Sequence, residues 1–381
     1  MIKAVKEKKQ LFFSILSIAC AILLMSACNT GTKTDKSAND KVVDPILLLS
    51  ENETLLQVLD SVSYVPLLED ESYLFSSISK LIVRNNTIYV FDLLGSNSLL
   101  CFDLSGNFLF KVGQRGSGPN EYSKLWDFDV DDSNIYLYDI AKKQMLLYDL
   151  QGKFVKTRNT HFRGEAFKLL KNGDVLFSLA KGEAGNELLV KTDSAFVIRK
   201  VYLKYSDKDQ DDKLTNNIFQ ESEDVVYYNK AVNDTVYSFS RINGEMGKSY
   251  IFNFKNSAVP SELKNKYEEL SSKRNHEDYI YFFDTPFVVG KTLIGSIFKG
   301  KNKATLMYNL ESKKFQICEW LPNKLSYRDI FLPLFTDGKM IIGWIDSEIY
   351  ESLGTKPTLS KQLIDHLNGG GRLLAIYKLA R

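Results

Sequence analysis

The sequence VGQRGSGPNEY at positions 112–122 has the residue types of a ligand-binding loop. Three glycines, a proline, an arginine and a glutamate lie there between two apolar runs. A phosphate-binding loop needs Gly-x4-Gly-Lys-Ser/Thr at the start of a helix, and a dinucleotide-binding loop needs a βαβ unit. Neither pattern is present here, because the segment that follows the loop looks like a strand and no Lys-Ser/Thr pair follows the last glycine. We therefore expect a tight chain crossing, braced by a pair between Arg115 and Glu121, and no nucleotide or other cofactor.

Metal-binding and catalytic patterns are also missing from the sequence. The histidines, His161, His276 and His366, are far apart in the sequence, and no two cysteines have the spacing of zinc ligands. The acidic run DKDQDD at 207–212 lacks the glycine and the distal glutamate of a calcium loop, which favours a solvated acidic loop. No nucleophile elbow or Ser-x-x-Lys constellation stands out. We expect no metal, although catalysis by Asp, Glu or Tyr stays open.

The N-terminus has the pattern of an export signal. A basic start is followed by a 17-residue uncharged apolar run at 11–27, which ends in Ser-Ala before Cys28. This cysteine position resembles a bacterial lipobox, which implies cleavage before Cys28 and lipid attachment to it. The alternative is a transmembrane anchor, since 17 residues is near the lower limit for spanning a bilayer. Loss of four lysines and one glutamate with residues 1–27 changes the formal net charge from +2 to −1. No basic field for nucleic acid remains.

The rest of the chain repeats with a period near 46 residues. The segments 78–113 and 126–157 align, with Gly106 and Gly152 46 residues apart in equivalent turns. Each contains four strand-like runs, which is typical of a propeller blade. Weaker copies follow at 165–203, 217–254, 279–321 and 329–346, and the last copy regains its third strand only at 371–380.

The last copy has three strands, and the run SVSYVPLL at 61–68 has no partner before the first copy. Pairing this run into the last copy closes a ring and removes both sheet edges. The middle strands are apolar on both faces, as in sheets covered on both sides. We predict an all-β, six-bladed β-propeller of four-stranded antiparallel blades over 60–381, after a signal peptide (1–27) and a lipidated tether (28–59).

Smaller features complete the predicted fold. Apolar stripes predict two short helical inserts, one near 263–270 and one near 359–367 that is capped by Thr358 and ended by Gly369. Asp103 and Asp149 precede Gly-containing turns and are expected to make local turn hydrogen bonds. Cys101 falls in blade one and Cys318 in blade five, too far apart for a disulfide, so both are expected to pack as small hydrophobes.

In such a blade, the links between strands one and two and between strands three and four emerge on one face, here called the turn face. The remaining links, including those between blades, emerge on the other, here called the loop face. The turn-face links are short, whereas the loop face carries 112–122, 158–164, 204–217, 260–278, 321–329 and 347–371.

Binding usually lies on long loops held by a rigid scaffold. The candidate ligand contacts are Arg115, Glu121, Tyr122, Trp126, Arg163, His276, Tyr279 and Arg328. Of these, Tyr122 and Trp126 are equally compatible with packing between blades.

The loop 112–122, followed by FDVDDSNIYLYD and LLYDLQGKF, resembles the NHL-type propeller repeat. The region 60–381 resembles, more closely, the six-bladed β-propeller lipoproteins of Bacteroidetes. The resemblance implies export and lipid anchoring in a bacterial cell envelope, at the outer membrane, and implies nothing about activity. Metal-dependent lactonases and lyases are other propeller relatives, but their acidic or histidine ligands have no counterpart here.

These patterns favour a binding module over an enzyme. We expect a lipid-anchored propeller that binds a peptide, glycan or protein partner on its loop face, and no nucleic acid. The alternative is a carboxylate- or metal-dependent hydrolase or lyase acting on glycans or lactones. Three or more carboxylates converging on one point at the channel mouth would favour that enzyme.

Overall fold

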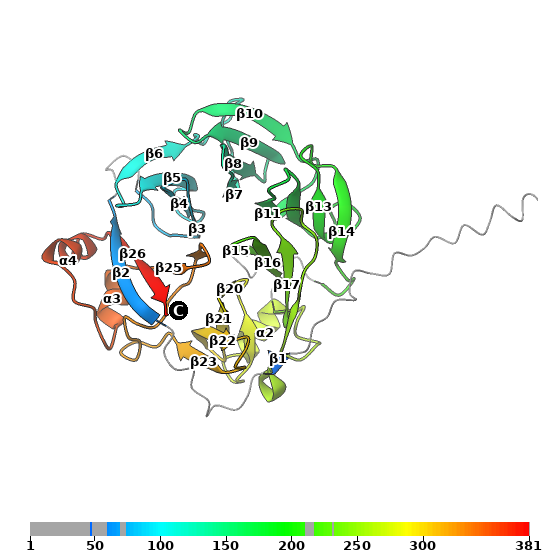
Figure 1. Cartoon of the computed structure of the whole chain (residues 1–381). Coiled ribbons are helices and arrows are strands. Elements are labelled where there is room, and N and C mark those ends of the chain that lie inside the picture. The colour runs from blue at the N-terminus through cyan, green and yellow to red at the C-terminus, as the bar shows by residue number, and fades with distance from the viewer. Residues whose placement is uncertain (1–45, 48–58, 69–73, 210–216, 231, 381) are drawn as a thin grey trace, which may run out of the picture. The chain divides into compact units, whose positions relative to one another are not determined.

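The computed structural model describes residues 46–47, 59–68, 74–209, 217–230 and 232–380, which belong to one compact unit, Lys41–Arg381. Six antiparallel sheets form a ring in this unit (Figure 1). The predicted signal peptide, Cys28 and most of the predicted tether lie outside the described residues, as does part of the acidic run 207–212. Within the described ranges, no helix is both long enough and apolar enough to cross a membrane.

The first three blades each contain four strands, in sequence order from the centre of the ring outward. Blade one consists of β3 (Lys80–Arg84), β4 (Thr87–Asp92), β5 (Ser98–Asp103) and β6 (Phe108–Val112). Blade two consists of β7 (Leu125–Val130), β8 (Asn134–Asp139), β9 (Gln144–Asp149) and β10 (Phe154–Asn159). Blade three consists of β11 (Gly164–Leu169), β12 (Val175–Leu179), β13 (Glu187–Thr192) and β14 (Ile198–Lys204).

The other three blades depart from this regularity. Blade four consists of β15 (Phe219–Ser222), β16 (Val225–Asn229), β17 (Thr235–Ser240) and β18 (Tyr250–Asn253), with β1 (Ile46–Leu47) added in parallel. Blade five consists of β19 (Ile280–Phe282), β20 (Phe287–Val289), β21 (Thr292–Lys299), β22 (Asn302–Asn309) and β23 (Phe315–Glu319). Blade six consists of β24 (Phe335–Thr336), β25 (Met340–Ile345), β26 (Arg372–Leu379) and β2 (Leu59–Leu67).

The strand β2 closes the ring as predicted. It pairs antiparallel with the last strand, from Leu59 opposite Leu379 to Leu67 opposite Arg372. Figure 1 shows β2 beside β26, next to blade one. The six-bladed all-β prediction is therefore confirmed, and the N-terminal strand joins the two ends of the described ring.

Two strand features were not predicted from the sequence. The backbone of β1 lies within the segment assigned to the tether and extends blade four by a parallel strand. In blade five, β19 and β20 both pair with β21, so the innermost strand is interrupted between Phe282 and Phe287. Pro286 lies in this interruption, and proline cannot donate a hydrogen bond to a sheet ladder.

The helices lie in the predicted links but differ in detail. The first region contains α2 (Tyr267–Lys273), and a 3-10 turn that was not predicted, η1 (Lys255–Ser257), precedes it. The link of blade six contains α3 (Ser347–Ser352), which was not predicted, and α4 (Lys361–Asn368). Gly369 ends α4 as predicted, but the cap prediction was wrong. The side chain of Ser360, not Thr358, accepts from Leu363 N–H, because the helix begins two residues later than the apolar stripe indicates.

Aromatic side chains fill the spaces between blades. Phe91 of blade one meets Phe128 of blade two edge to face, with ring centroids 5.8 Å apart. Phe252 and Phe282 make the same kind of contact between blades four and five at 5.0 Å. Such pairs stabilise packing beyond their buried area. This packing explains why the middle strands are apolar on both faces.

Cys101 and Cys318 form no disulfide, as predicted. Cys101 is fully buried in β5, and Cys318 is partly buried in β23. Burial raises the pKa of both thiols. Both behave as small packing residues, not as reactive thiolates.

Candidate functional site

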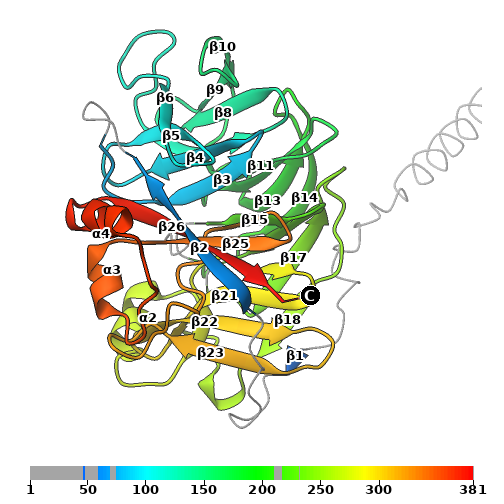
Figure 2. The same cartoon turned by 60° about the vertical axis from the view of Figure 1, so that its left-hand side comes forward.

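The links of the ring separate onto two faces. On the turn face they run from two residues, as at 85–86, to nine residues at 241–249. On the loop face, the link 113–124 joins blades one and two, and the link 346–371 carries α3 and α4. Figure 2 shows α2, α3 and α4 on the same side of the ring. The structure therefore places its added elements on the loop face.

The turn-face links are held by local hydrogen bonds. The carboxylate of Asp103 accepts from the backbone N–H groups of Ser105 and Asn107, at 2.8 and 2.9 Å. Asp149 accepts in the same way from Gln151 and Lys153. The prediction of a structural role for these two aspartates is confirmed.

The link 112–122 folds back on itself. The N–H of Gly116 donates to the carbonyl of Tyr122 at 2.9 Å, and the N–H of Tyr122 donates to the carbonyl of Gln114 at 3.1 Å. Glu121 turns inward and accepts from the N–H of Gly118 at 2.8 Å. Within the described residues, Glu121 makes no ion pair with Arg115, so that expected brace was wrong. The glutamate instead binds the backbone of its own loop.

The first three candidates in this region differ in exposure. Arg115 is exposed, Glu121 is half-buried, and Tyr122 has no exposed surface. Tyr122 packs in the core shared by blades one and two, so it takes the packing role named as its alternative. Trp126 is half-buried against the core of blades two and three, with the Lys124 ammonium group 5.0 Å from its ring centroid.

The other four candidates lie in three separate links around the ring. Arg163 pairs with Glu165 at 3.2 Å, in the link between blades two and three. His276 is exposed after α2, and Tyr279 packs partly against a small core beneath that helix. Arg328 is exposed and lies over the ring of Tyr327, at 5.7 Å, in the link between blades five and six. The structure does not bring these residues to one point.

Sequence reasoning missed a charged network along the central channel. The innermost strands carry it: β3 supplies Lys80 and Arg84, β7 supplies Asp127 and Asp129, β11 supplies Lys168, and β15 supplies Glu221. Lys80 pairs with Asp127 at 2.8 Å. Lys168 pairs with Asp129 at 2.9 Å and with Glu221 at 2.6 Å.

Two arginines complete this network, which we call the channel network. Arg84 pairs with Glu221 and donates to the carbonyl of Val130. Arg241, from the link after β17, lies 3.2 Å from the same glutamate. The signal in the sequence was the alternation of charged and apolar residues in the first strand of each early repeat, as in WDFDV at 126–130.

The carboxylates of the channel network also bind the neighbouring blade. Asp127 accepts from the N–H of Phe167, and Asp129 accepts from the N–H of Leu169, each at 2.9 Å. Burial alone would raise the pKa of Asp129, but the charges of Lys168, Lys80 and Arg84 outweigh burial and lower it. Burial likewise opposes the charge of Glu221, and Lys168 with both arginines still lowers its pKa. Both carboxylates are therefore ionised at neutral pH.

The channel network does not have the geometry of a metal site. Among the described residues, no group of three or more His, Cys, Asp or Glu side chains is placed to hold a metal ion. Each network carboxylate instead faces a lysine or an arginine. The carboxylate convergence that would favour a hydrolase or lyase is not found in these ranges.

Exposed leucines mark the loop face beside blade one. Leu94, between β4 and β5, is 82% exposed, and Leu74, before β3, is 63% exposed. The carboxylate of Asp92 joins their two segments, because it accepts from the N–H of Ser76 and from that of Gly95, each at 2.9 Å. Two large apolar side chains are therefore held at the surface by ordered backbone.

Solved structures support the fold assignment. A Bacteroides fragilis NCTC 9343 protein described as exported has a TM-score of 0.71 and 18% identity, with 88% of this chain and 99% of that chain covered. A DUF4221-family protein of Bacteroides vulgatus ATCC 8482 has a TM-score of 0.50 and 11% identity, with 87% and 99% covered. At these identities the likeness concerns the fold alone.

The sequence itself identifies the family. No curated protein matches the chain. Residues 47–368 match the family described as "Domain of unknown function (DUF4934)", a range that includes strands of all six blades. The chain therefore belongs to the DUF4934 family.

Proposed function

We propose that this protein is an exported, lipid-anchored propeller that binds a peptide, a glycan or a protein partner on its loop face. One observation carries the proposal: two large apolar side chains, Leu74 and Leu94, are 63% and 82% exposed there on hydrogen-bonded backbone. These two leucines are the most exposed large apolar side chains among the described residues, and large exposed apolar patches rimmed by polar groups are typical of interaction sites.

Exposed hydrogen-bond donors on the same face support binding. Arg115, His276 and Arg328 are exposed in three different loop-face links. Arginine and histidine can donate hydrogen bonds to the carboxylates, amides and hydroxyls of peptides and glycans. Their separation around the ring favours an extended ligand or a partner surface over a small molecule.

The expected location rests on two kinds of support. The N-terminal pattern up to Cys28 is that of an exported lipoprotein. The structurally similar Bacteroides fragilis protein is described as exported. We therefore propose a position in the cell envelope, with lipid on Cys28 as the anchor and propeller repeats of the NHL type above it.

A matched pair of leucines tests the binding face. Leu94 lies on the loop face and Leu104, 50% exposed, on the turn face, both in links of blade one. The purified full-length chain is screened by thermal shift against glycan and peptide libraries. For any ligand found, Leu94→Asp should weaken binding about 10-fold or more, and Leu104→Asp should leave it unchanged. Equal effects of both variants would contradict the proposal.

The screen also distinguishes the ligand classes. A ligand that binds only the folded chain raises its melting temperature. Stabilisation by oligosaccharides or by peptides would identify the class directly. If neither stabilises the chain, the protein-partner form of the proposal is the one to pursue, by photo-cross-linking from position 94.

Substitution of Cys28 tests the proposed lipid anchor. Cys28→Ala should move the protein from the membrane fraction to the soluble fraction, because the lipid attachment site is lost. Thr30→Ala, two residues further along the chain, is the matched control and should leave the protein in the membrane fraction. Retention of uncleaved Cys28→Ala protein in the membrane would instead favour a transmembrane anchor.

A further inference from the structure

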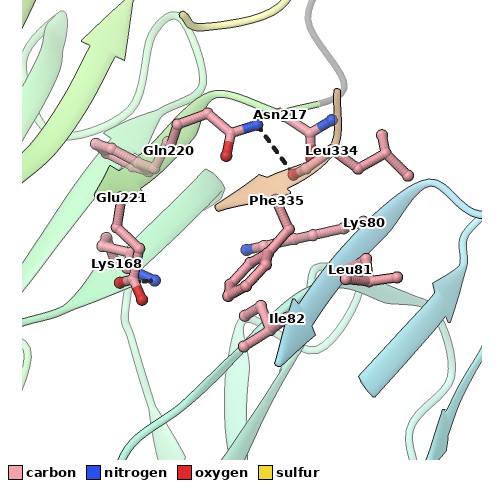
Figure 3. Close-up of a pocket in the computed structure, with 10 residues that line it drawn as sticks. Lys80, Leu81, Ile82, Lys168, Asn217, Gln220, Glu221, Leu334 and Phe335 are labelled. Carbon is pink, nitrogen blue, oxygen red and sulfur yellow. Dashed lines mark hydrogen bonds and ion pairs between the residues drawn. The ribbon is translucent and has the colours of Figure 1, made fainter. Parts of the chain in front are cut away.

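A small pocket lies within the central channel and is not part of the proposed loop-face site. Its walls come from blades one, three, four and six, as Figure 3 shows. The pocket is small, with about 10 Å³ of space for the centres of water-sized molecules. The lining residues are Lys80, Leu81, Ile82, Lys168, Asn217, Phe219, Gln220, Glu221, Leu334 and Phe335.

The pocket has an excess of positive charge. Two ammonium groups, those of Lys80 and Lys168, line it against one carboxylate, that of Glu221. The whole channel network has the same imbalance, since Lys80, Lys168 and the two arginines face three carboxylates. These side chains are at most 15% exposed, so solvent compensates little of the surplus charge.

Both lysines keep a donor for a ligand. Lys80 donates to Asp127 at 2.8 Å and to the carbonyl of Phe128 at 2.7 Å. Lys168 donates to Asp129 and pairs with Glu221. An ammonium group has three N–H donors, so these two oxygen partners leave one donor on each lysine within the described residues. Figure 3 shows the ammonium end of Lys80 pointing across the pocket toward the side of Lys168 and Glu221.

We propose that this pocket binds one small anion, with a carboxylate group held by the free donors of Lys80 and Lys168. The anion would neutralise the surplus charge and accept from both ammonium groups, and charge-assisted hydrogen bonds of this kind are strong. The amide of Gln220, which already donates to the carbonyl of Leu334 at 3.3 Å, lines the same space.

The remaining walls define the class of anion. Phe219, Leu334 and Phe335 supply apolar groups to the walls. A space this small fits the shortest monocarboxylates better than a phosphate, which is larger and needs more donors. Asn217 and Leu334 belong to loop-face links, so the pocket reaches toward that face. The inference does not rest on the proposed function, because it holds even if the loop face binds no partner.

Calorimetry on the full-length chain tests the inference with acetate, propionate, butyrate and inorganic phosphate as probes at constant ionic strength. We expect saturable binding of a monocarboxylate that is tighter than that of phosphate. Lys80→Met should weaken it roughly 10-fold or more, since one charge-assisted hydrogen bond is lost. Lys171→Met is the matched control, because Lys171 pairs with Asp224 on the exposed turn face and should leave binding unchanged.

A crystal soaked in bromide covers the case in which Lys80→Met fails to fold. Bromide can be located by its anomalous scattering in the wild-type protein. An anion within hydrogen-bond distance of both Lys80 and Lys168 supports the inference. Bromide sites elsewhere with none in the pocket would overturn it, as would carboxylate binding that Lys171→Met and Lys80→Met weaken equally.

Discussion

The two faces of the ring are built in different ways. Links on the turn face are short, hydrogen-bonded and often packed against the preceding blade: Gly106 adjoins Pro66 of β2, and Gly152 adjoins Phe110 of β6. The longest links, 254–279 and 346–371, are on the loop face and carry the helices, and the most exposed large apolar side chain, Leu94, lies on this face. The ring is therefore stabilised by its turn-face links, which leaves the loop face freer to serve recognition.

Most of the channel network, apart from Lys80 at the start of β3, lies toward the turn face. Strands β7 and β15 run from the loop face to the turn face, and Asp129 and Glu221 lie one residue before their ends. The ion pairs of Lys168 and Arg84 are thus concentrated near the turn-face end of the channel. Substitutions there should therefore affect stability more than substitutions on the loop face.

The largest effect is expected from Asp129→Ala. The substitution leaves the buried ammonium group of Lys168 with one fewer partner and the N–H of Leu169 without its acceptor. Breaking a buried ion pair from one side costs about 3–5 kcal/mol of unfolding free energy. Asp224→Ala, in an exposed pair with Lys171, should cost less than about 1 kcal/mol. Urea unfolding measures both, and similar losses would contradict the assigned role.

Acid should lower the stability of the folded chain, because it protonates the carboxylates at the turn-face end of the channel. The pKa values of Asp129 and Glu221 are lowered in the folded chain, so their contribution is complete above the unfolded pKa values of about 4. This stabilising contribution is lost as the pH falls from the unfolded pKa values through the lower pKa values of the folded chain. Urea midpoints between pH 7 and pH 2.5 should fall steeply below about pH 4, and less steeply in Asp129→Ala. Equal slopes would show that other groups cause the acid sensitivity.

A pair of glycines compares the two faces directly. Gly106, on the turn face, has φ +84°, and a Cβ there would lie 1.7 Å from the carbonyl oxygen of Pro66, at the closing seam of the ring. Gly182, on the loop face, has φ +82° and open space around its Cβ position. We expect Gly106→Ala to cost about 2–3 kcal/mol and Gly182→Ala about 1 kcal/mol. Equal thermal shifts would mean that the seam is not tightly packed.

The smallest effect concerns the cap of α4. Ser360→Ala removes the side-chain acceptor for Leu363 N–H and should cost about 1 kcal/mol. Thr358→Ala, at the position that the sequence pattern favoured, should change stability by less than about 0.5 kcal/mol. Chemical denaturation distinguishes the two, and a larger loss for Thr358→Ala would favour Thr358 as the cap.

The sequence predicted the ring well because its signals are local and repeated. The period near 46 residues and the unpaired run at 61–68 were enough for six blades and for closure by β2. The channel network could not be read in the same way, since Arg84 of blade one meets Glu221 of blade four only across the closed ring. The pair of Arg115 with Glu121 failed for the opposite reason: proximity in sequence does not decide whether a carboxylate turns toward a cation or toward backbone N–H groups.

The candidate site was predicted only as a face. The structure confirms that the longest links share one side of the ring, but it disperses Arg115, Arg163, His276 and Arg328 among separate links. The exposure of Leu94 had no signal in the sequence, because the same leucine could equally have packed against a neighbouring blade.

Photo-cross-linking in intact cells shows directly whether the loop face engages the partner. A benzophenone amino acid replaces Leu94 in one strain and Leu104 in another, since these residues are exposed on opposite faces of blade one. If the loop face binds the partner, irradiation should give a discrete cross-linked product from position 94 and none from position 104. Products from position 104 alone, or the same product from both positions, would contradict it.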